Sequence, residues 1–294
     1  MEYIVKTTDL VKQYGKKTAV NKVSVNIKKG EIYGLIGKNG AGKTTLMKLL
    51  LGLTEPSSGT LSLFGGMDPY AARRKIGSII EAPALYKNET AYENMKRFAI
   101  LSSATDEEIR DLLNIVGLGN LGKLKVKSFS LGMRQRLGIA IALLGKPELL
   151  VLDEPLNGLD PEGIKGMRNI ILHLNSMGVS FIISSHLLDE LGKIATNYGI
   201  LSDGSLVEEI CAKELAEKCR TSLRISVDNV TEAIRLLEKE YSEIEATGER
   251  NVSVYSKVED SSLIVEALVK NGIRVYEVVN EIKSLEDFFV ERLG

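Results

Sequence analysis

Tryptophan is absent from this sequence, and cysteine, histidine and proline are scarce, with two, two and six residues among 294. The two cysteines, Cys211 and Cys219, are not spaced as a C-x-x-C pair. The sequence therefore indicates no disulfide framework, as is usual for a protein of a reducing compartment.

Long apolar runs are also lacking. The longest candidate, residues 137–144, falls well short of the roughly 18–20 residues that span a bilayer and is typical of a buried helix. The first six residues have neither the basic block nor the apolar block of a secretion signal. We therefore expect a cytoplasmic protein without a membrane span of its own.

An excess of charge of one sign is missing as well. The formal net charge is −1, which argues against a nucleic-acid partner and against a polybasic membrane anchor. Hydrophobic residues make up 44% and charged residues 26%, as in ordinary globular proteins. The length allows one large α/β domain and a smaller second one.

The most informative segment is 37–45, Gly-Lys-Asn-Gly-Ala-Gly-Lys-Thr-Thr, which matches the phosphate-loop pattern G-x-x-x-x-G-K-[ST]. An apolar strand pattern (32–36) precedes it and a helical pattern (46–51) follows, which is the required context. The glycines let backbone N–H groups surround a polyphosphate at a helix N-terminus. We expect nucleotide contacts from Gly37, Asn39, Gly40, Gly42, Lys43, Thr44 and Thr45, with the Thr44 hydroxyl also on Mg²⁺.

Alternation predicts short strands at Ile4–Leu10, Val20–Ile27 and Ile32–Ile36. Two wholly apolar runs (149–152 and 179–183) predict parallel strands buried on both faces. Helical patterns fill much of 82–145, and a further helix is expected between the two buried strands, over residues 161–177. Beyond a boundary near 215, residues 216–294 read as a small α+β domain, with a ferredoxin-like order as one possibility.

Asp153 and Glu154 follow the buried strand 149–152 directly. Parallel sheets place ligand sites at the carboxyl ends of their strands, which is also where the phosphate loop lies. Asp153 is suited to hold Mg²⁺ through water, and Glu154 to deprotonate the water that attacks the γ-phosphate. The alternative is a polar strand end with no catalytic role.

Ser130 precedes a helical pattern and has the position of an N-cap, so the free N–H groups behind it could bind an anion. With this segment, roughly residues 1–210 resemble the ATP-binding subunits of ABC transporters, and we expect that domain to span residues 1–215. The resemblance rests on the phosphate loop, on Ser130-Leu131-Gly132-Met133 as the signature, on Asp153-Glu154, on the D-loop 157–160 and on His186 after a strand.

This resemblance implies a P-loop NTPase fold of the α/β class, with an antiparallel β subdomain and a helical subdomain. It implies ATP and Mg²⁺ as cofactors and a head-to-tail homodimer, in which Ser130 and Gly132 approach the γ-phosphate of the other copy. His186 would hydrogen-bond that phosphate, Asp160 would link the two sites, and Tyr14 would stack on adenine. A separate membrane permease would contact the helical region near 82–127, which would hold the protein at the inner face of the cell membrane.

Two departures from the family pattern stand out. Leu131 and Met133 occupy signature positions where many relatives have glycine and glutamine. Glu81 stands where the Q-loop glutamine is usual; its carboxylate could still ligate Mg²⁺, but it brings a negative charge toward the phosphates. In this feature and as a whole, the chain is similar to the transporters that export bacitracin or protect bacteria against lantibiotics.

Other interpretations stay open at this point. Tyr14 could be a surface tyrosine, Glu81 an ordinary loop glutamate, and His186 a histidine with a structural role. The rival function is a soluble ABC-type ATPase that acts on ribosomes or DNA without a permease, although such proteins usually carry paired ATPase domains or a long insertion.

Overall fold

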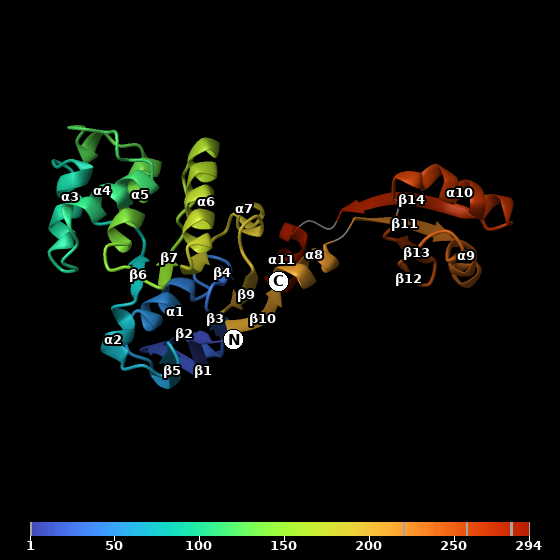
Figure 1. Ribbon diagram of the computed structural model, residues 1–294. Coiled ribbons are helices and arrows are strands. Elements are labelled where there is room, and N and C mark those ends of the chain that lie inside the picture. Colours follow the sequence, from blue (N-terminus) through green and yellow to red (C-terminus); the bar gives the residue numbers. More distant parts are fainter. Residues whose placement is uncertain (1, 220, 257, 283–284, 294) are drawn as a thin grey trace. The chain divides into compact units, whose positions relative to one another are not determined.

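The structure is a computed structural model that describes residues 2–219, 221–256, 258–282 and 285–293. The chain divides into two compact units (Figure 1). The first comprises residues 1–212 together with 292–294, and the second comprises residues 213–291. The chain thus leaves the first unit after Ala212 and returns to it at Arg292.

The centre of the first unit is a six-stranded sheet in which β4, β6, β7, β8 and β9 run parallel and β10 is antiparallel to β9. Every residue of β4, β7 and β8 is buried, as expected for apolar strands covered on both faces. In spatial order the strands are β10 (Ser205–Cys211), β9 (Asn197–Ser202), β4 (Ile32–Ile36), β8 (Ser180–Ser184), β7 (Leu149–Leu152) and β6 (Ile76–Ile79).

A second, antiparallel sheet is built around the 12-residue strand β1. Its strands are β2 (Lys17–Val23), β1 (Tyr3–Tyr14), β3 (Asn26–Lys28) and β5 (Ser58–Leu63). The single strand predicted at Val20–Ile27 is wrong, because the chain breaks into β2 and β3 there. The Thr7 hydroxyl explains the break, since it donates to the Val23 carbonyl and accepts from the Val25 N–H at 2.9 and 2.8 Å.

Helices of the first unit begin with clear capping chemistry. Thr90 and Thr105 each form a capping box with the glutamate three residues later, and Asp68 and Asp160 each cap a helix that begins with proline. The helices are α1 (Lys43–Leu50), α2 (Pro69–Arg73), α3 (Ala91–Ala99), α4 (Asp106–Ile115), η1 (Val126–Ser128), α5 (Leu131–Ala142), α6 (Pro161–Ser176) and α7 (Leu188–Gly192). Helices α3, α4 and α5 pack on one another and form the helical part of this unit.

The second unit has the order β-α-β-β-α-β, preceded by α8 (Ala212–Lys218) and followed by α11 (Leu285–Leu293). Its antiparallel sheet has the strand order β12-β13-β11-β14, which is the ferredoxin-like arrangement. The elements are β11 (Thr221–Val227), α9 (Val230–Leu237), β12 (Ile244–Ala246), β13 (Asn251–Val254), η2 (Val258–Asp260), α10 (Ser261–Lys270) and β14 (Val275–Ile282). Together with the first unit, this confirms the predicted fold class.

The end of the chain is fastened to the first unit by an ion pair. Arg292 Nε donates to Glu208 Oε2 on β10 at 2.7 Å, and both side chains are about three-quarters buried, with 29% and 25% of their surface exposed. Among the described residues no helix is long and apolar enough to cross a membrane.

Candidate active site

The phosphate loop leaves β4 and enters α1 through two glycines with positive φ, Gly40 (+85°) and Gly42 (+103°). A Cβ on Gly42 would lie 2.4 Å from the Ala19 carbonyl oxygen, and one on Gly37 would lie 2.5 Å from that of Leu201. Neighbouring backbone therefore leaves no room for side chains at these two positions, and the loop can keep its shape only with glycine.

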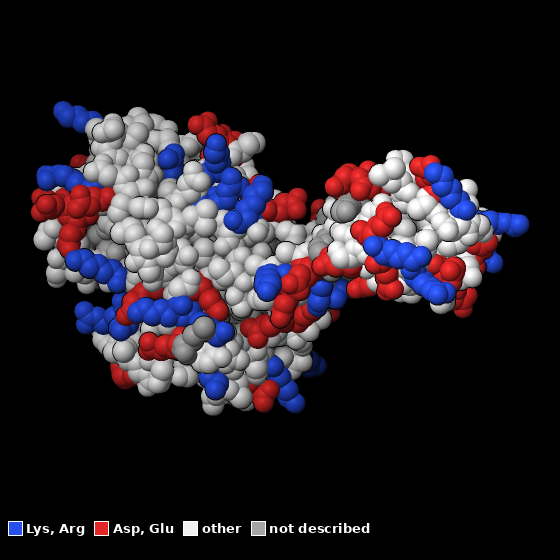
Figure 2. Space-filling view, turned by 45° about the vertical axis from the view of Figure 1, so that its right-hand side comes forward, with Lys and Arg blue, Asp and Glu red and all other residues white. Residues whose placement is uncertain are grey.

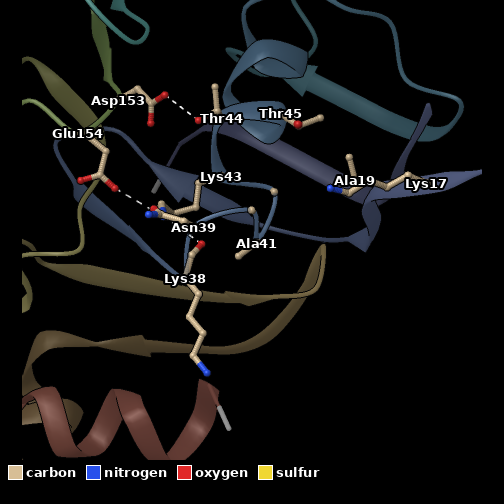
Figure 3. Close-up of a pocket in the computed structure, with 12 residues that line it drawn as sticks. Lys17, Ala19, Lys38, Asn39, Ala41, Lys43, Thr44, Thr45, Asp153 and Glu154 are labelled. Atoms are coloured by element: carbon tan, nitrogen blue, oxygen red, sulfur yellow. Dashed lines mark hydrogen bonds and ion pairs between the residues drawn. The ribbon is translucent and has the colours of Figure 1, made fainter. Parts of the chain in front are cut away.

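Lys43 is the buried cation of this loop, with 7% of its side chain exposed. Its Nζ donates to the Gly37 carbonyl at 2.6 Å and lies 3.6 Å from Glu154 Oε1 (Figure 3). Burial of an uncompensated ammonium is costly, and these oxygens compensate the charge of Lys43. A bound phosphate could take over that role.

Asp153 and Glu154 lie at the carboxyl end of β7, beside α1. Thr44 Oγ1 donates to Asp153 Oδ2 at 2.7 Å, which places a hydroxyl and a carboxylate oxygen side by side (Figure 3). Mg²⁺ is usually bound by few protein oxygens of this kind together with phosphate oxygens, so this pair fits the metal by its chemistry. The structure holds Asp153 almost fully buried, with 5% exposed.

Glu154 has a left-handed backbone, with φ at +49°, which is uncommon for a residue with a side chain. Its carboxylate reaches His186, whose Nδ1 lies 2.7 Å from Glu154 Oε2. The same oxygen accepts from the His186 N–H at 3.3 Å. Glu154 is thus held between a lysine and a histidine, in a strained conformation that is common at functional positions.

Ser184 is a site residue that the sequence pattern did not identify. Its hydroxyl donates to Asp153 Oδ1 at 2.6 Å and accepts from the Glu154 N–H at 2.8 Å. The side chain is fully buried and fixes both acidic residues from the adjacent strand β8. The only sequence signal was a pair of serines between a wholly apolar strand and His186.

These groups surround a cavity of about 240 Å³, and Asn157 and His186 line a neighbouring one of about 370 Å³ beside Glu154. The first cavity is lined by Lys17, Ala19, Lys38, Asn39, Gly40, Ala41, Gly42, Lys43, Thr44, Thr45, Asp153 and Glu154. Lys17 and Ala19, from β2, are further lining residues that the sequence pattern did not single out.

The remaining candidates lie outside both cavities. Tyr14 ends β1 with 49% of its surface exposed, and Lys12 Nζ lies 4.9 Å from its ring centroid. Glu81 follows β6 and pairs with Lys48 on α1, at 3.1 Å between Oε1 and Nζ. Tyr14 and Glu81 therefore do not line either of these two cavities in the structure.

The signature and D-loop residues are placed at helix starts. Ser130 caps α5 by accepting from the Met133 N–H at 3.2 Å, and Asp160 caps α6 by accepting from the Gly163 N–H at 2.9 Å. A Cβ on Gly132 would lie 3.6 Å from Leu159 of the D-loop, so the two segments are neighbours within one chain. None of these residues lines the phosphate cavity of its own chain.

Comparison with known proteins gives a consistent result. Residues 20–157 match the family described as "ABC transporter". The whole chain is 42% identical to the bacitracin transport ATP-binding protein BcrA of Bacillus licheniformis, over 98% of that protein. Seventy per cent of the chain is 50% identical to the lantibiotic transport ATP-binding protein SrtF of Streptococcus pyogenes, over 90% of that protein.

Among solved structures, the chain is similar to cbiO1 from Clostridium perfringens, part of the ABC transporter complex cbiONQ. The TM-score is 0.68 at 25% identity, and the match covers 82% of this chain and 96% of that one.

Proposed function

The chain belongs to the ABC transporter family of ATP-binding proteins and is an ATPase, and from that premise we propose that it energises a separate membrane permease that exports peptide antibiotics. The observation that most directly supports ATP hydrolysis as the energy source is the convergence of four side chains on one cavity. Lys43, Thr44, Asp153 and Glu154 meet there, at the carboxyl edge of a parallel sheet. Figure 2 shows both basic and acidic side chains on the visible face, including a group of neighbouring basic side chains on the first unit.

In the proposed reaction the phosphate loop holds the triphosphate and Lys43 binds its terminal oxygens. Lys43 then exchanges its contact with Glu154, 3.6 Å away, for phosphate, and the Glu154 carboxylate becomes free to accept a proton from water. The water oxygen attacks the γ-phosphorus and ADP leaves. His186, whose Nδ1 lies 2.7 Å from Glu154, orients that carboxylate and hydrogen-bonds the departing phosphate.

Thr44 and Asp153 would hold Mg²⁺, which when bound neutralises charge on the β- and γ-phosphates. Ser184 keeps Asp153 in place through its 2.6 Å hydrogen bond. The Thr44–Asp153 hydrogen bond, at 2.7 Å, keeps these two groups side by side, where they would hold the metal.

The catalytic unit is a homodimer in this proposal. Ser130 and Gly132 lie at the start of α5 and do not line the cavity of their own chain, so a second copy has to supply them to the phosphate. The N–H groups at this helix start are suited to a γ-phosphate because they carry partial positive charge. Asp160, at the start of α6, would then lie at the seam between the copies.

The permease would bind at a groove of about 670 Å³ on the first unit, lined by both polar and apolar side chains. Ile76, Phe98, Leu101, Ile141 and Leu144 supply apolar walls or flanks, and Leu101 is 86% exposed. Arg73, Arg74 and Lys146 line the same groove, together with Glu108, which pairs with Lys146. Basic side chains thus outnumber acidic ones there, and the groove suits a segment with apolar and acidic residues. Such a contact would place the protein at the inner face of the membrane.

The proposed cargo is a peptide antibiotic because two similar proteins, BcrA and SrtF, are named for the transport of bacitracin and of a lantibiotic. The test is to express the chain with its permease in a sensitive bacterium and to measure growth inhibition by bacitracin and by a lantibiotic. We expect tolerance to at least one of them to rise, and to be lost with Glu154→Gln. Unchanged sensitivity to both, with the permease demonstrably present in the membrane, would overturn the cargo.

A further inference from the structure

Glu81 has a specific partner in the structure. Its Oε1 lies 3.1 Å from Nζ of Lys48, which belongs to α1, the helix that follows the phosphate loop. Glu81 itself stands two residues beyond the end of β6. The ion pair therefore joins the phosphate-loop helix to the segment that leads into the helical part of the unit.

This ion pair is the second of two links between α1 and the neighbouring strand ends. In the first, Thr44 donates to Asp153, whose N–H is bonded to the Ile79 carbonyl at 2.9 Å, so the ends of β6 and β7 are tied together. Lys48 lies four residues after Thr44 and hence on the same helix face, about 6 Å further along. Both links therefore fix the same side of α1.

The backbone at Glu81 is adapted to this contact. Its φ is +66°, in the left-handed region that residues with side chains rarely adopt. The side chain of Glu81 is 73% exposed and that of Lys48 is 36% exposed, so water reaches both groups. A turn of this kind persists when surrounding contacts stabilise it, and the ion pair is one such contact.

The ion pair also fixes the position of the Glu81 carboxylate. A carboxylate near a triphosphate is repelled by it, whereas the amide of a glutamine is not. In the structure the carboxylate rests on α1 and is not among the residues that line the phosphate cavity. The cation on α1 therefore offsets the charge that distinguishes glutamate from glutamine at this position.

We propose that Lys48 is a positioning residue for Glu81: it holds the carboxylate on α1 and keeps its charge off the bound phosphates. This inference rests on the proposed function, because it assumes that a triphosphate occupies the cavity. Without the lysine the carboxylate turns freely and lowers nucleotide affinity. The effect is greatest without Mg²⁺, because no metal then offsets the phosphate charge.

The test compares the wild type with Lys48→Met, Glu81→Gln and the double variant, using Lys48→Arg as the matched control. Binding of trinitrophenyl-ATP is measured in EDTA and again with Mg²⁺. We expect Lys48→Met to weaken binding in EDTA about three- to tenfold, an effect of the size of one screened charge pair. The double variant should bind like Glu81→Gln, and Lys48→Arg should stay within about twofold of the wild type.

An equal loss of affinity from Lys48→Met in the wild-type background and in the Glu81→Gln background would overturn the inference, because the lysine would then act on nucleotide directly. Thermal unfolding of the same proteins without nucleotide measures the pair independently of any ligand. A coupling between the two substitutions that fades at high salt supports the pair, and zero coupling overturns it. A wild type that binds no nucleotide in either buffer would overturn the proposed function, and this role with it.

Discussion

The phosphate cavity and the groove lined by Phe98 and Leu101 are built in different ways, although they belong to the same unit. In the cavity the buried charged groups are already held: Lys43 by carbonyl oxygens and Glu154, and Asp153 by two hydroxyls. In the groove the apolar side chain of Leu101 is uncovered, at 86% exposure, and the adjacent Ile100 is 79% exposed. The cavity is thus preorganised for a small charged ligand, whereas the groove leaves apolar side chains exposed.

This contrast implies that chemistry and coupling can be disabled separately. Substitutions in the cavity should stop turnover whether or not a permease is present. Substitutions in the groove should leave the isolated ATPase unchanged. Three substitutions test that separation, and a fourth lies outside both regions; they follow in order of decreasing effect.

Glu154→Gln removes the proposed base and keeps its size. We expect the rate of ATP hydrolysis to fall by roughly 10²–10⁴, the range for loss of a positioned general base. Nucleotide binding should persist, because Lys43 and the loop glycines are untouched. Phosphate release and trinitrophenyl-ATP binding, measured on the same preparation, check this; hydrolysis at the parent rate would remove Glu154 from the role.

Lys43→Ala removes the buried cation of the cavity. We expect ATP affinity to fall by roughly 10–100-fold, because a charge-assisted contact of about 1.5–3 kcal/mol is lost. Equilibrium binding with labelled ATP measures the change. Circular dichroism of the variant is the control for folding, and unchanged affinity in a folded variant would contradict the assignment.

Leu101→Glu changes the groove and not the cavity. Because Leu101 is 86% exposed, we expect the fold and the ATPase rate of the isolated protein to stay within about twofold of the wild type. Binding to permease-containing membranes should fall by roughly tenfold or more, since the partner would have to bury a charge. Co-sedimentation with those membranes measures it, and equal binding would separate this groove from the permease.

Glu148→Gln changes neither region and should affect stability alone. Hydrogen bonds from Lys75 and Lys29, at 2.7 and 2.9 Å, lower the pKa of Glu148 below its usual value. A lowered pKa in the folded state means that the contribution to stability is present above the unfolded pKa, near about 4.3, and is lost as pH falls through the folded value.

We therefore expect the free energy of unfolding to drop by about 0.5–1 kcal/mol at pH 7 in this variant, a small effect because the carboxylate is one-third exposed. The difference from the wild type should close in acid. Urea unfolding at pH 7 and at about pH 3.5 tests both statements, and a difference that persists in acid would argue against the ion pairs as its source.

Much of the fold follows from local sequence patterns. The strands 32–36 and 149–152 are predicted from their apolar runs, and the structure has β4 and β7 at those residues. Strand β6 was not predicted, because Ile-Gly-Ser-Ile has no strong strand pattern and its order comes from pairing with β7. Gly77 is needed there, since a Cβ would lie 2.2 Å from the Ala142 carbonyl.

In the candidate site, too, some residues can be predicted from local sequence patterns and others cannot. The phosphate loop and Asp153-Glu154 are contiguous motifs whose meeting follows from parallel strand topology. Ser184 and Lys48 act through partners 31 and 33 residues away in sequence, Asp153 and Glu81. Only the placement of β8 beside β7, and of α1 beside the end of β6, brings these groups together, and local sequence patterns do not reveal that placement.

The Arg292–Glu208 ion pair bears on how the protein can be dissected. A chain cut after Ala212 would keep the phosphate loop and Asp153-Glu154, but β10 would lose the guanidinium that Glu208 now binds. Such a fragment should unfold at a lower temperature than the whole chain, because it lacks this ion pair. The small unit is thus best removed by an internal deletion that keeps the last residues, not by truncation.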